Sequence, residues 1–214
     1  MKYKLAIFDM DGTILNTLED LRDSLNVSLA VCNFPPRTLE EVRSFVGNGI
    51  HRTIEQAVSN EATSQQIETV FDYFENYYPS HCKIKTAPYD GVIETIQKIK
   101  ASGGKTAVVS NKADIAVHKL CDIFFPNLFD YEIGQKPENE RKPSPDSVNE
   151  VLEKLSISSK DSVYIGDSEV DLATAKNSNM DCIAVSWGFR DKAFLASHGA
   201  TCIVDKPMEI EAFF

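Results

Sequence analysis

The sequence predicts an α/β fold in which helices cover a parallel β-sheet and a second, helical domain is inserted after the first strand. Two observations lead to this prediction. Short apolar segments alternate with helical patterns along most of the chain, which is typical of βαβ units. Between residues 16 and 86 the alternation stops and only helical patterns remain. We therefore expect a core domain of residues 1–15 and 87–214 and an inserted helical domain of residues 16–86.

The first expected element is a strand over residues 5–8, whose unbroken apolar run is typical of a strand buried on both faces of a sheet. The inserted domain begins with apolar residues at three- and four-residue steps from Leu18 to Cys32, which predict an amphipathic helix. Pro35 follows and ends it. Further helices are expected over residues 39–45, 50–58 and 64–78. The last of them has Ser64 as its expected N-cap.

After Pro88, strands and helices alternate. The expected strands span residues 106–109, 131–133, 162–165 and 182–185. The expected helices span residues 92–99, 113–121, 146–155 and 169–178. Because each strand is separated from the next by a helix, the sheet is expected to be parallel and covered on both faces.

The composition narrows the possible partners. The chain has 22 basic and 32 acidic residues, a formal net charge of -10, which disfavours binding to nucleic acid or to an anionic membrane. An anionic substrate then requires a local cluster of positive charge.

The five cysteines are widely spaced, which favours free thiols in a reducing compartment. With no signal peptide or apolar stretch of about 20 residues, we expect a cytoplasmic protein. A monomer is the default expectation for its oligomeric state.

Polar side chains follow several of the predicted strands. In an open parallel sheet, ligands bind at the carboxyl ends of the strands, so these residues are the candidates for a functional site. A lysine in the loop ahead of the helix at 146–155 lies near the same edge. The candidates are Asp9, Asp11, Thr13, Ser110, Asn111, Lys142, Asp167 and Asp171.

Four aspartates at one edge indicate a bound cation. Two carboxylates about 5 Å apart repel by roughly 3 kcal/mol at an effective dielectric constant near 20. Oxygen ligands from short acids suit Mg²⁺, which also binds substrate phosphate. A calcium loop of the EF-hand type starting at Asp9 is the alternative, but Ile14 stands where such a loop needs glycine. Ser110 or Ser168 alone is equally compatible with a helix cap, whereas caps do not require four acids.

These residues resemble the four motifs of the haloacid dehalogenase superfamily, in the same order and with similar spacing. The motifs read Asp9-x-Asp11-Gly12-Thr13, Ser110-Asn111, Lys142-Pro143 and Gly166-Asp167-Ser168-x-x-Asp171. The resemblance implies a Rossmann-like core and identifies the helical insert as the family's mobile cap domain. Phosphoglycolate phosphatase-like members are the most similar, because residues 43–49 and 185–188 resemble theirs.

The resemblance implies Mg²⁺-dependent hydrolysis of a small phosphorylated metabolite through an aspartyl-phosphate. Asp9 is then the nucleophile, and Asp11 protonates the leaving group and activates the water. Mg²⁺ would be bound by Asp9, the backbone carbonyl of Asp11 and Asp167. Asp171 would bind the ion directly or through a water molecule, or would lie in its second coordination shell. Lys142 would neutralise both the phosphate and the nucleophile.

The remaining candidates concern substrate binding. The resemblance implies that Thr13, Ser110 and the Asn111 amide contact the phosphoryl group. In the cap, Arg43 and Gly47 are candidates for binding the far end of the substrate. Alternatively, Arg43 is an arginine on the solvent-exposed side of a helix, and Gly47 merely forms a turn.

Three other functions remain open at this point. A phosphomutase related to β-phosphoglucomutase would use the same motifs, provided that its aspartyl-phosphate resists water until a sugar binds. A pyrophosphatase of the same superfamily is a second alternative. A non-catalytic binding module is the third, and the complete set of acids argues against it.

Overall fold

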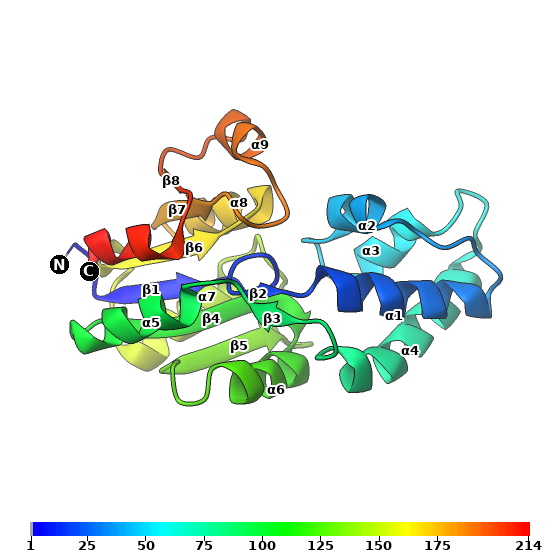
Figure 1. Ribbon diagram of the computed structural model, residues 1–214, viewed down its shortest axis with the longest axis horizontal. Coiled ribbons are helices and arrows are strands. Elements are labelled where there is room, and N and C mark those ends of the chain that lie inside the picture. Colours follow the sequence, from blue (N-terminus) through cyan, green and yellow to red (C-terminus); the bar gives the residue numbers. More distant parts are fainter. Residues whose placement is uncertain (1) are drawn as a thin grey trace. The chain divides into compact units, whose positions relative to one another are not determined.

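The computed structural model describes residues 2–214, and these fold as two compact units (Figure 1). Residues Asn16–Ala87 form one of them, which we call the helical unit. The remaining described residues, up to Leu15 and from Pro88 onward, form the sheet unit. The short strands β2 (Leu15–Asn16) and β3 (Ala87–Pro88) pair with each other where the chain passes between the units.

Six strands of the described chain form the main sheet, in the order β5-β4-β1-β6-β7-β8 (Figure 1). They are β1 (Leu5–Phe8), β4 (Lys105–Ala113), β5 (Tyr131–Gln135), β6 (Ser162–Gly166), β7 (Asp181–Val185) and β8 (Ile203–Val204). Neighbouring strands pair in parallel throughout. Strand β1 lies between β4 and β6, and all four of its residues are buried. The predicted α/β class with a parallel sheet is therefore confirmed.

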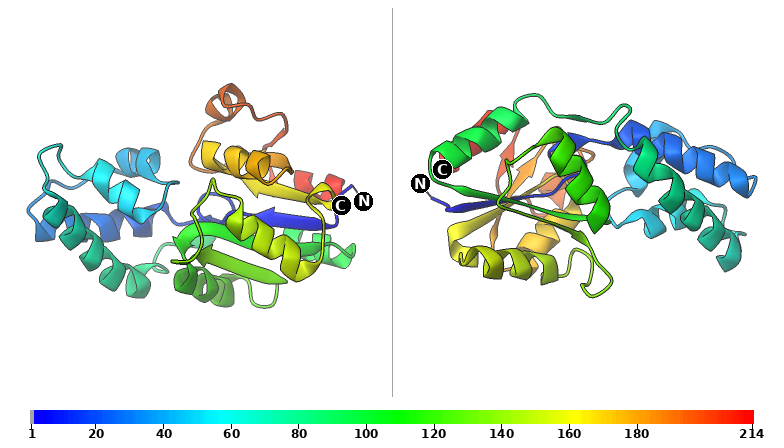
Figure 2. Two further views of the ribbon diagram at one scale, coloured as in Figure 1. Left: turned by 180° about the vertical axis from the view of Figure 1, so that it is seen from behind. Right: turned by 90° about the horizontal axis from the view of Figure 1, so that it is seen from below.

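Helices cover both faces of this sheet. They are α5 (Val92–Ala101), α6 (Asp114–Phe124), α7 (Asp146–Leu155), α8 (Glu169–Asn177) and α9 (Lys192–Ser197), with 3-10 turns η1 (Ser159–Asp161) and η2 (Pro207–Phe213). Helices α7 and α8 lie on one face, and α5 with η2 on the other (Figure 2). Under α7 and α8 a hydrophobic core joins Leu5 and Ile7 of β1, Val148 and Val151 of α7, and Tyr164 of β6.

The helical unit consists of α1 (Leu18–Val31), α2 (Leu39–Phe45), α3 (Ile50–Ala57) and α4 (Ser64–His81). A buried carboxylate fixes the segment that follows α4. Asp20 of α1 accepts hydrogen bonds from the backbone N–H groups of Ile84, Lys85 and Thr86 at 2.9–3.0 Å. The returning chain is therefore held against the first helix.

Several details differ from the expectations, among them a helix cap and the elements near the end of the chain. Thr63, rather than Ser64, caps α4, because its hydroxyl accepts the N–H of Gln66 while the Gln66 side chain accepts the N–H of Thr63. Ser64 would place the apolar Ile67 where that reciprocal bond is needed. The elements after residue 190 were not expected, because they are too short to show a period. Within residues 2–214, no helix combines the length and the apolar character that crossing a membrane requires.

Candidate active site

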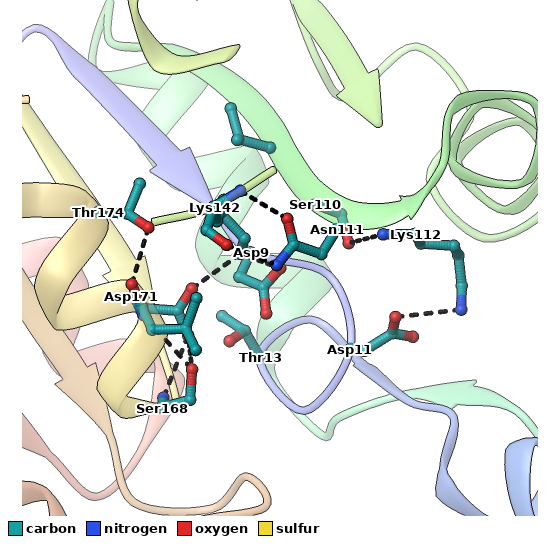
Figure 3. Close-up of polar contacts among 12 residues, drawn as sticks. Asp9, Asp11, Thr13, Ser110, Asn111, Lys112, Lys142, Ser168, Asp171 and Thr174 are labelled. Atoms are coloured by element: carbon teal, nitrogen blue, oxygen red, sulfur yellow. Dashed lines mark hydrogen bonds and ion pairs between the residues drawn. The ribbon is translucent and has the colours of Figure 1, made fainter. Parts of the chain in front are cut away.

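The candidate site forms where the three central strands of the sheet end. Asp9 directly follows β1, Ser110 lies in the last part of β4, and Asp167 directly follows β6. Two more side chains join them from neighbouring elements. Lys142 comes from the loop between β5 and α7, and Asp171 comes from the first turn of α8 (Figure 3).

A buried ammonium group lies at the centre of this cluster. Lys142 Nζ donates hydrogen bonds to Oδ1 of Asp9 and Oδ1 of Asp171, both at 2.8 Å, and only 4% of its side chain is exposed. Burial by itself lowers the pKa of Lys142, but attraction to Asp171 and Asp9 outweighs burial and holds the pKa well above its ordinary value. The lysine therefore stays charged.

The carboxylates outnumber this single cation. Asp9, Asp167 and Asp171 are buried, and each places a carboxylate oxygen within 4.8 Å of the others. Burial, and then repulsion from Asp171 and Asp9, raises the pKa of Asp167 well above its ordinary value. Burial also raises the pKa of Asp9, to about 7, although Lys142 opposes the shift. Closely spaced carboxylate oxygens with too little positive charge fit a divalent cation such as Mg²⁺.

Asp171 organises the cluster with both of its oxygens. Oδ1 binds Lys142, while Oδ2 accepts the backbone N–H groups of Asp167 and Ser168 at 3.1 Å and the Ser168 hydroxyl at 2.6 Å. Ser168 is the N-cap of α8, so the structure agrees with the interpretation of this serine as a helix cap. The carboxylate of Asp171 thus holds the turn after β6 and the lysine in one arrangement.

Two glycine-containing loops close around Asp167. Its Oδ2 accepts the N–H of Phe189 at 2.6 Å. A side-chain carbon at Gly12 or at Gly188 would overlap atoms of the Asp167 side chain. Gly12 also adopts a φ of +88°, a conformation that favours glycine. The two loops can therefore approach this carboxylate only because both positions lack a side chain.

Asn111 links the end of β4 to the lysine loop. Its side-chain Oδ1 accepts the backbone N–H of Lys142 at 2.7 Å, and its Nδ2 donates to the backbone carbonyl of Lys142 at 3.1 Å. Ser110 beside it is buried, and its hydroxyl accepts the N–H of Lys112 at 3.3 Å. The Asn111 side chain thus positions Lys142, while phosphate binding by Ser110 and Asn111 stays a prediction.

Asp11 makes a separate ion pair. Its Oδ2 lies 3.0 Å from Nζ of Lys112, and its carboxylate points toward that lysine (Figure 3). The cluster of possible metal ligands found among the described residues does not include the Asp11 carboxylate. Thr13 lies closer to the cluster, because its hydroxyl faces Oδ1 of Asp167 at 3.4 Å.

Sequence reasoning missed two polar residues of this site. Lys112 follows Ser110-Asn111 at a strand end, so the rule that selected those residues would also have found it. Tyr164 is hidden inside the apolar run of β6, yet its hydroxyl accepts a hydrogen bond from Lys142 at 3.0 Å. No pattern in the sequence distinguishes this tyrosine from an ordinary core residue.

Arg43 and Gly47 belong to the helical unit. Arg43 lies exposed in the last turn of α2, and Gly47 follows that helix with a φ of +129°. Their contacts with a substrate stay a prediction.

The chain is similar to known proteins in sequence and in fold. Residues 6–185 match the family model of the haloacid dehalogenase-like hydrolases. The chain is 32% identical over 197 residues to a phosphoglycolate phosphatase of Psychrobacter arcticus, covering 88% of this chain and 86% of that one. A crystal structure from Lactobacillus delbrueckii subsp. bulgaricus, of a protein proposed to be a phosphoglycolate phosphatase, superposes with a TM-score of 0.94 at 39% identity, covering 99% and 98% of the two chains.

A third comparison concerns the fold alone. A structure from Bacteroides vulgatus, of a protein proposed to be a β-phosphoglucomutase, superposes with a TM-score of 0.79 at 20% identity, covering 98% of this chain and 86% of that one. The family match spans most of the chain, and the chain therefore belongs to the haloacid dehalogenase-like hydrolases. Within that family it is a phosphoglycolate phosphatase-like member.

The charge balance of the cluster yields a prediction. Lys142→Met should lower the free energy of unfolding by about 3 kcal/mol, because it leaves buried carboxylates without their ammonium partner. Lys154→Met, at an exposed position on α7, is the matched control and should unfold like the wild type. Urea unfolding of the metal-free protein measures both. A change of less than about 1 kcal/mol at Lys142 would contradict the predicted electrostatic role.

Proposed function

We propose that this protein is a Mg²⁺-dependent phosphatase that hydrolyses 2-phosphoglycolate through an aspartyl-phosphate on Asp9. One observation carries the proposal. The Asp9 carboxylate lies buried at the end of the central strand, 2.8 Å from the Lys142 ammonium and within reach of Asp167. Similarity to proteins named phosphoglycolate phosphatase supports the choice of substrate.

The first chemical step belongs to Asp9 and Lys142. A hydrogen bond from Lys142 fixes Oδ1 of Asp9, which leaves the other oxygen of that carboxylate to attack phosphorus. The bond from phosphorus to the leaving oxygen then breaks, and the phosphoryl group is transferred to Asp9. The buried ammonium offsets the negative charge of the nucleophile and the phosphate, and covalent catalysis divides the hydrolysis into two easier displacements.

Asp11 acts as the general acid in the first step and as the general base in the second. As an acid it gives a proton to the departing alkoxide, and as a base it takes one from the water that attacks the aspartyl-phosphate. The second step releases inorganic phosphate and restores the Asp9 carboxylate. For this role the Asp11 carboxylate must exchange its contact with Lys112 for one with the leaving oxygen.

The residues that would hold Mg²⁺ are Asp9, Asp167 and the backbone carbonyl of Asp11, with Asp171 beside them. When bound, the ion supplies positive charge that stabilises the charge developing on the transferred phosphoryl group. Ser110, Thr13 and the Asn111 amide would contact phosphoryl oxygens. The helical unit would act as the cap that excludes water and selects the substrate, in a cytoplasmic enzyme.

A phosphomutase and a pyrophosphatase use related chemistry, and no observation favours either. Fold similarity to a β-phosphoglucomutase-like structure does not distinguish mutase from phosphatase, because both use the same core. A screen of phosphorylated metabolites with Mg²⁺, followed by phosphate release, tests the proposal directly. Phosphate release from 2-phosphoglycolate above that from other esters supports it, whereas activity dependent on a sugar bisphosphate indicates the mutase.

The nucleophile can be tested by an isosteric change. Asp9→Asn should abolish turnover while the protein stays folded, because the amide is a poor nucleophile of the same shape. Asp72→Asn, at an exposed position on α4, controls for the chemical change and should keep wild-type activity. Phosphate release and circular dichroism measure the two properties. Retention of activity within about tenfold of wild type by Asp9→Asn would rule out the covalent mechanism.

The choice of substrate can be tested at Arg43. Phosphoglycolate carries a carboxylate opposite its phosphate, and an arginine can bind it with two parallel hydrogen bonds. Arg43→Ala should lower kcat/KM for phosphoglycolate by at least about tenfold, or roughly 1.4 kcal/mol. The value for p-nitrophenyl phosphate, which lacks that carboxylate, should change much less.

Two variants accompany this experiment. Arg52→Ala removes another exposed arginine, on α3, and should affect neither substrate. Arg43→Lys separates geometry from charge. An equal loss with both substrates would instead assign Arg43 to folding or closure of the cap, and no loss with either would remove it from the binding site.

A further inference from the structure

Tyr164 is a fully buried residue of β6 whose hydroxyl lies in the candidate active site. Its side chain belongs to the hydrophobic core under α7 and α8, where a phenylalanine would fill nearly the same volume. The hydroxyl accepts a hydrogen bond from Lys142 at 3.0 Å and donates one to the backbone carbonyl of Val109 at 3.1 Å. Burying a hydroxyl in such a core has a cost unless its hydrogen bonds are made, so its two partners indicate a specific role.

The partner of this hydroxyl is the group that contacts the proposed nucleophile. A lysine ammonium has three N–H donors. In Lys142 one faces Asp9, one faces Asp171 and one faces Tyr164. The first two contacts are attractions between opposite charges, whereas the tyrosine supplies a neutral acceptor. With all three directions occupied, the ammonium has one defined orientation.

The other end of the hydrogen-bond chain is also close to the site. Val109 immediately precedes Ser110, and the regular pairing of β4 with β5 breaks between Val109 and Ala113. The Tyr164 hydroxyl reaches from β6 past β1 to this point of β4. It therefore connects the ammonium to the strand segment that carries the predicted phosphate ligand Ser110.

We propose that Tyr164 is a positioning residue, whose hydroxyl orients the Lys142 ammonium toward Asp9 and ties it to the backbone beside Ser110. This inference rests on the proposed phosphatase function. Without the hydroxyl, one N–H of Lys142 has no acceptor in that direction, and the ammonium can turn toward Asp171. Such a turn weakens its contact with the nucleophile and with charge that develops in the transition state. Binding of the ground-state substrate depends less on this orientation.

The test compares Tyr164 with a tyrosine on an edge strand of the sheet, Tyr131 on β5. Tyr164→Phe removes only the hydroxyl. Tyr131→Phe is the control, because the Tyr131 hydroxyl on β5 donates a part-buried hydrogen bond to a residue other than Lys142, Glu150, at 2.7 Å. Steady-state kinetics with Mg²⁺ and p-nitrophenyl phosphate should show kcat lowered at least about tenfold for Tyr164→Phe, with KM within about twofold of wild type. Tyr131→Phe should keep both constants.

A second readout separates positioning from a structural effect. Orthovanadate adopts five-coordinate geometry similar to the transition state, whereas inorganic phosphate resembles the product. In Tyr164→Phe the inhibition constant of vanadate should rise by about tenfold, and that of phosphate should change by less than about twofold. All measurements are made well below the unfolding midpoint of each variant, which is determined by circular dichroism.

The outcomes separate this inference from the proposed function. If the wild type is active and Tyr164→Phe has an unchanged kcat, the positioning role is overturned and the proposed phosphatase function stands. Equal losses in the two tyrosine variants, equal weakening of vanadate and phosphate, or failure of Tyr164→Phe to fold also overturn it, because the hydroxyl would then serve the fold. A wild type inactive toward every ester overturns the proposed function, and the inference fails with it.

Discussion

The structure depends on an electrostatic constraint at the end of its central strands, where three buried carboxylates lie close together and the buried Lys142 ammonium contacts two of them. Asp9, Asp167 and Asp171 each place a carboxylate oxygen within 4.8 Å of the others, and Lys142 donates hydrogen bonds to two of them, Asp9 and Asp171. A cluster of this kind is unstable in isolation, because like charges repel strongly where water is excluded. The fold must therefore hold the groups together, and a bound cation would offset the repulsion that remains.

The hydrogen bonds around the cluster provide that restraint. Asp171 accepts three hydrogen bonds from the turn after β6. The side chain of Asn111 bonds both the backbone N–H and the backbone carbonyl of Lys142. Gly188 lets a third loop approach Asp167 closely. The carboxylates of Asp171 and Asp167 are thus held by main-chain N–H groups of different loops, and the Asn111 side chain holds the backbone of Lys142. Such preorganisation is what electrostatic catalysis requires, because the dipoles and charges do not have to rearrange during the reaction.

The sequence predicted the parallel sheet and the strand-end residues by the same rule. Once the apolar segments at residues 5–8 and 162–165 are recognised as buried neighbouring strands, Asp9 and Asp167 must follow them at one edge. The rule gives no information on side-chain direction. Whether Asp11 faces the cluster or Lys112 depends on its rotamer, and the sequence does not determine this.

Other features were hidden for different physical reasons. Tyr164 has the pattern of a core residue, and only the position of its hydroxyl reveals the contact with Lys142. The choice of Thr63 over Ser64 as a helix cap depends on which residue lies three positions later. The elements after residue 190 are too short to show a repeating pattern in the sequence.

We propose that a divalent cation balances the surplus negative charge of this cluster. Isothermal titration calorimetry of the metal-free protein with Mg²⁺ tests it most directly, with Asp167→Asn as the comparison. We predict binding at one site per chain and a dissociation constant at least about tenfold higher in the variant, because one carboxylate ligand becomes a neutral amide. Absence of binding to the wild type at millimolar Mg²⁺, or equal affinity in both proteins, would contradict a metal site at these carboxylates.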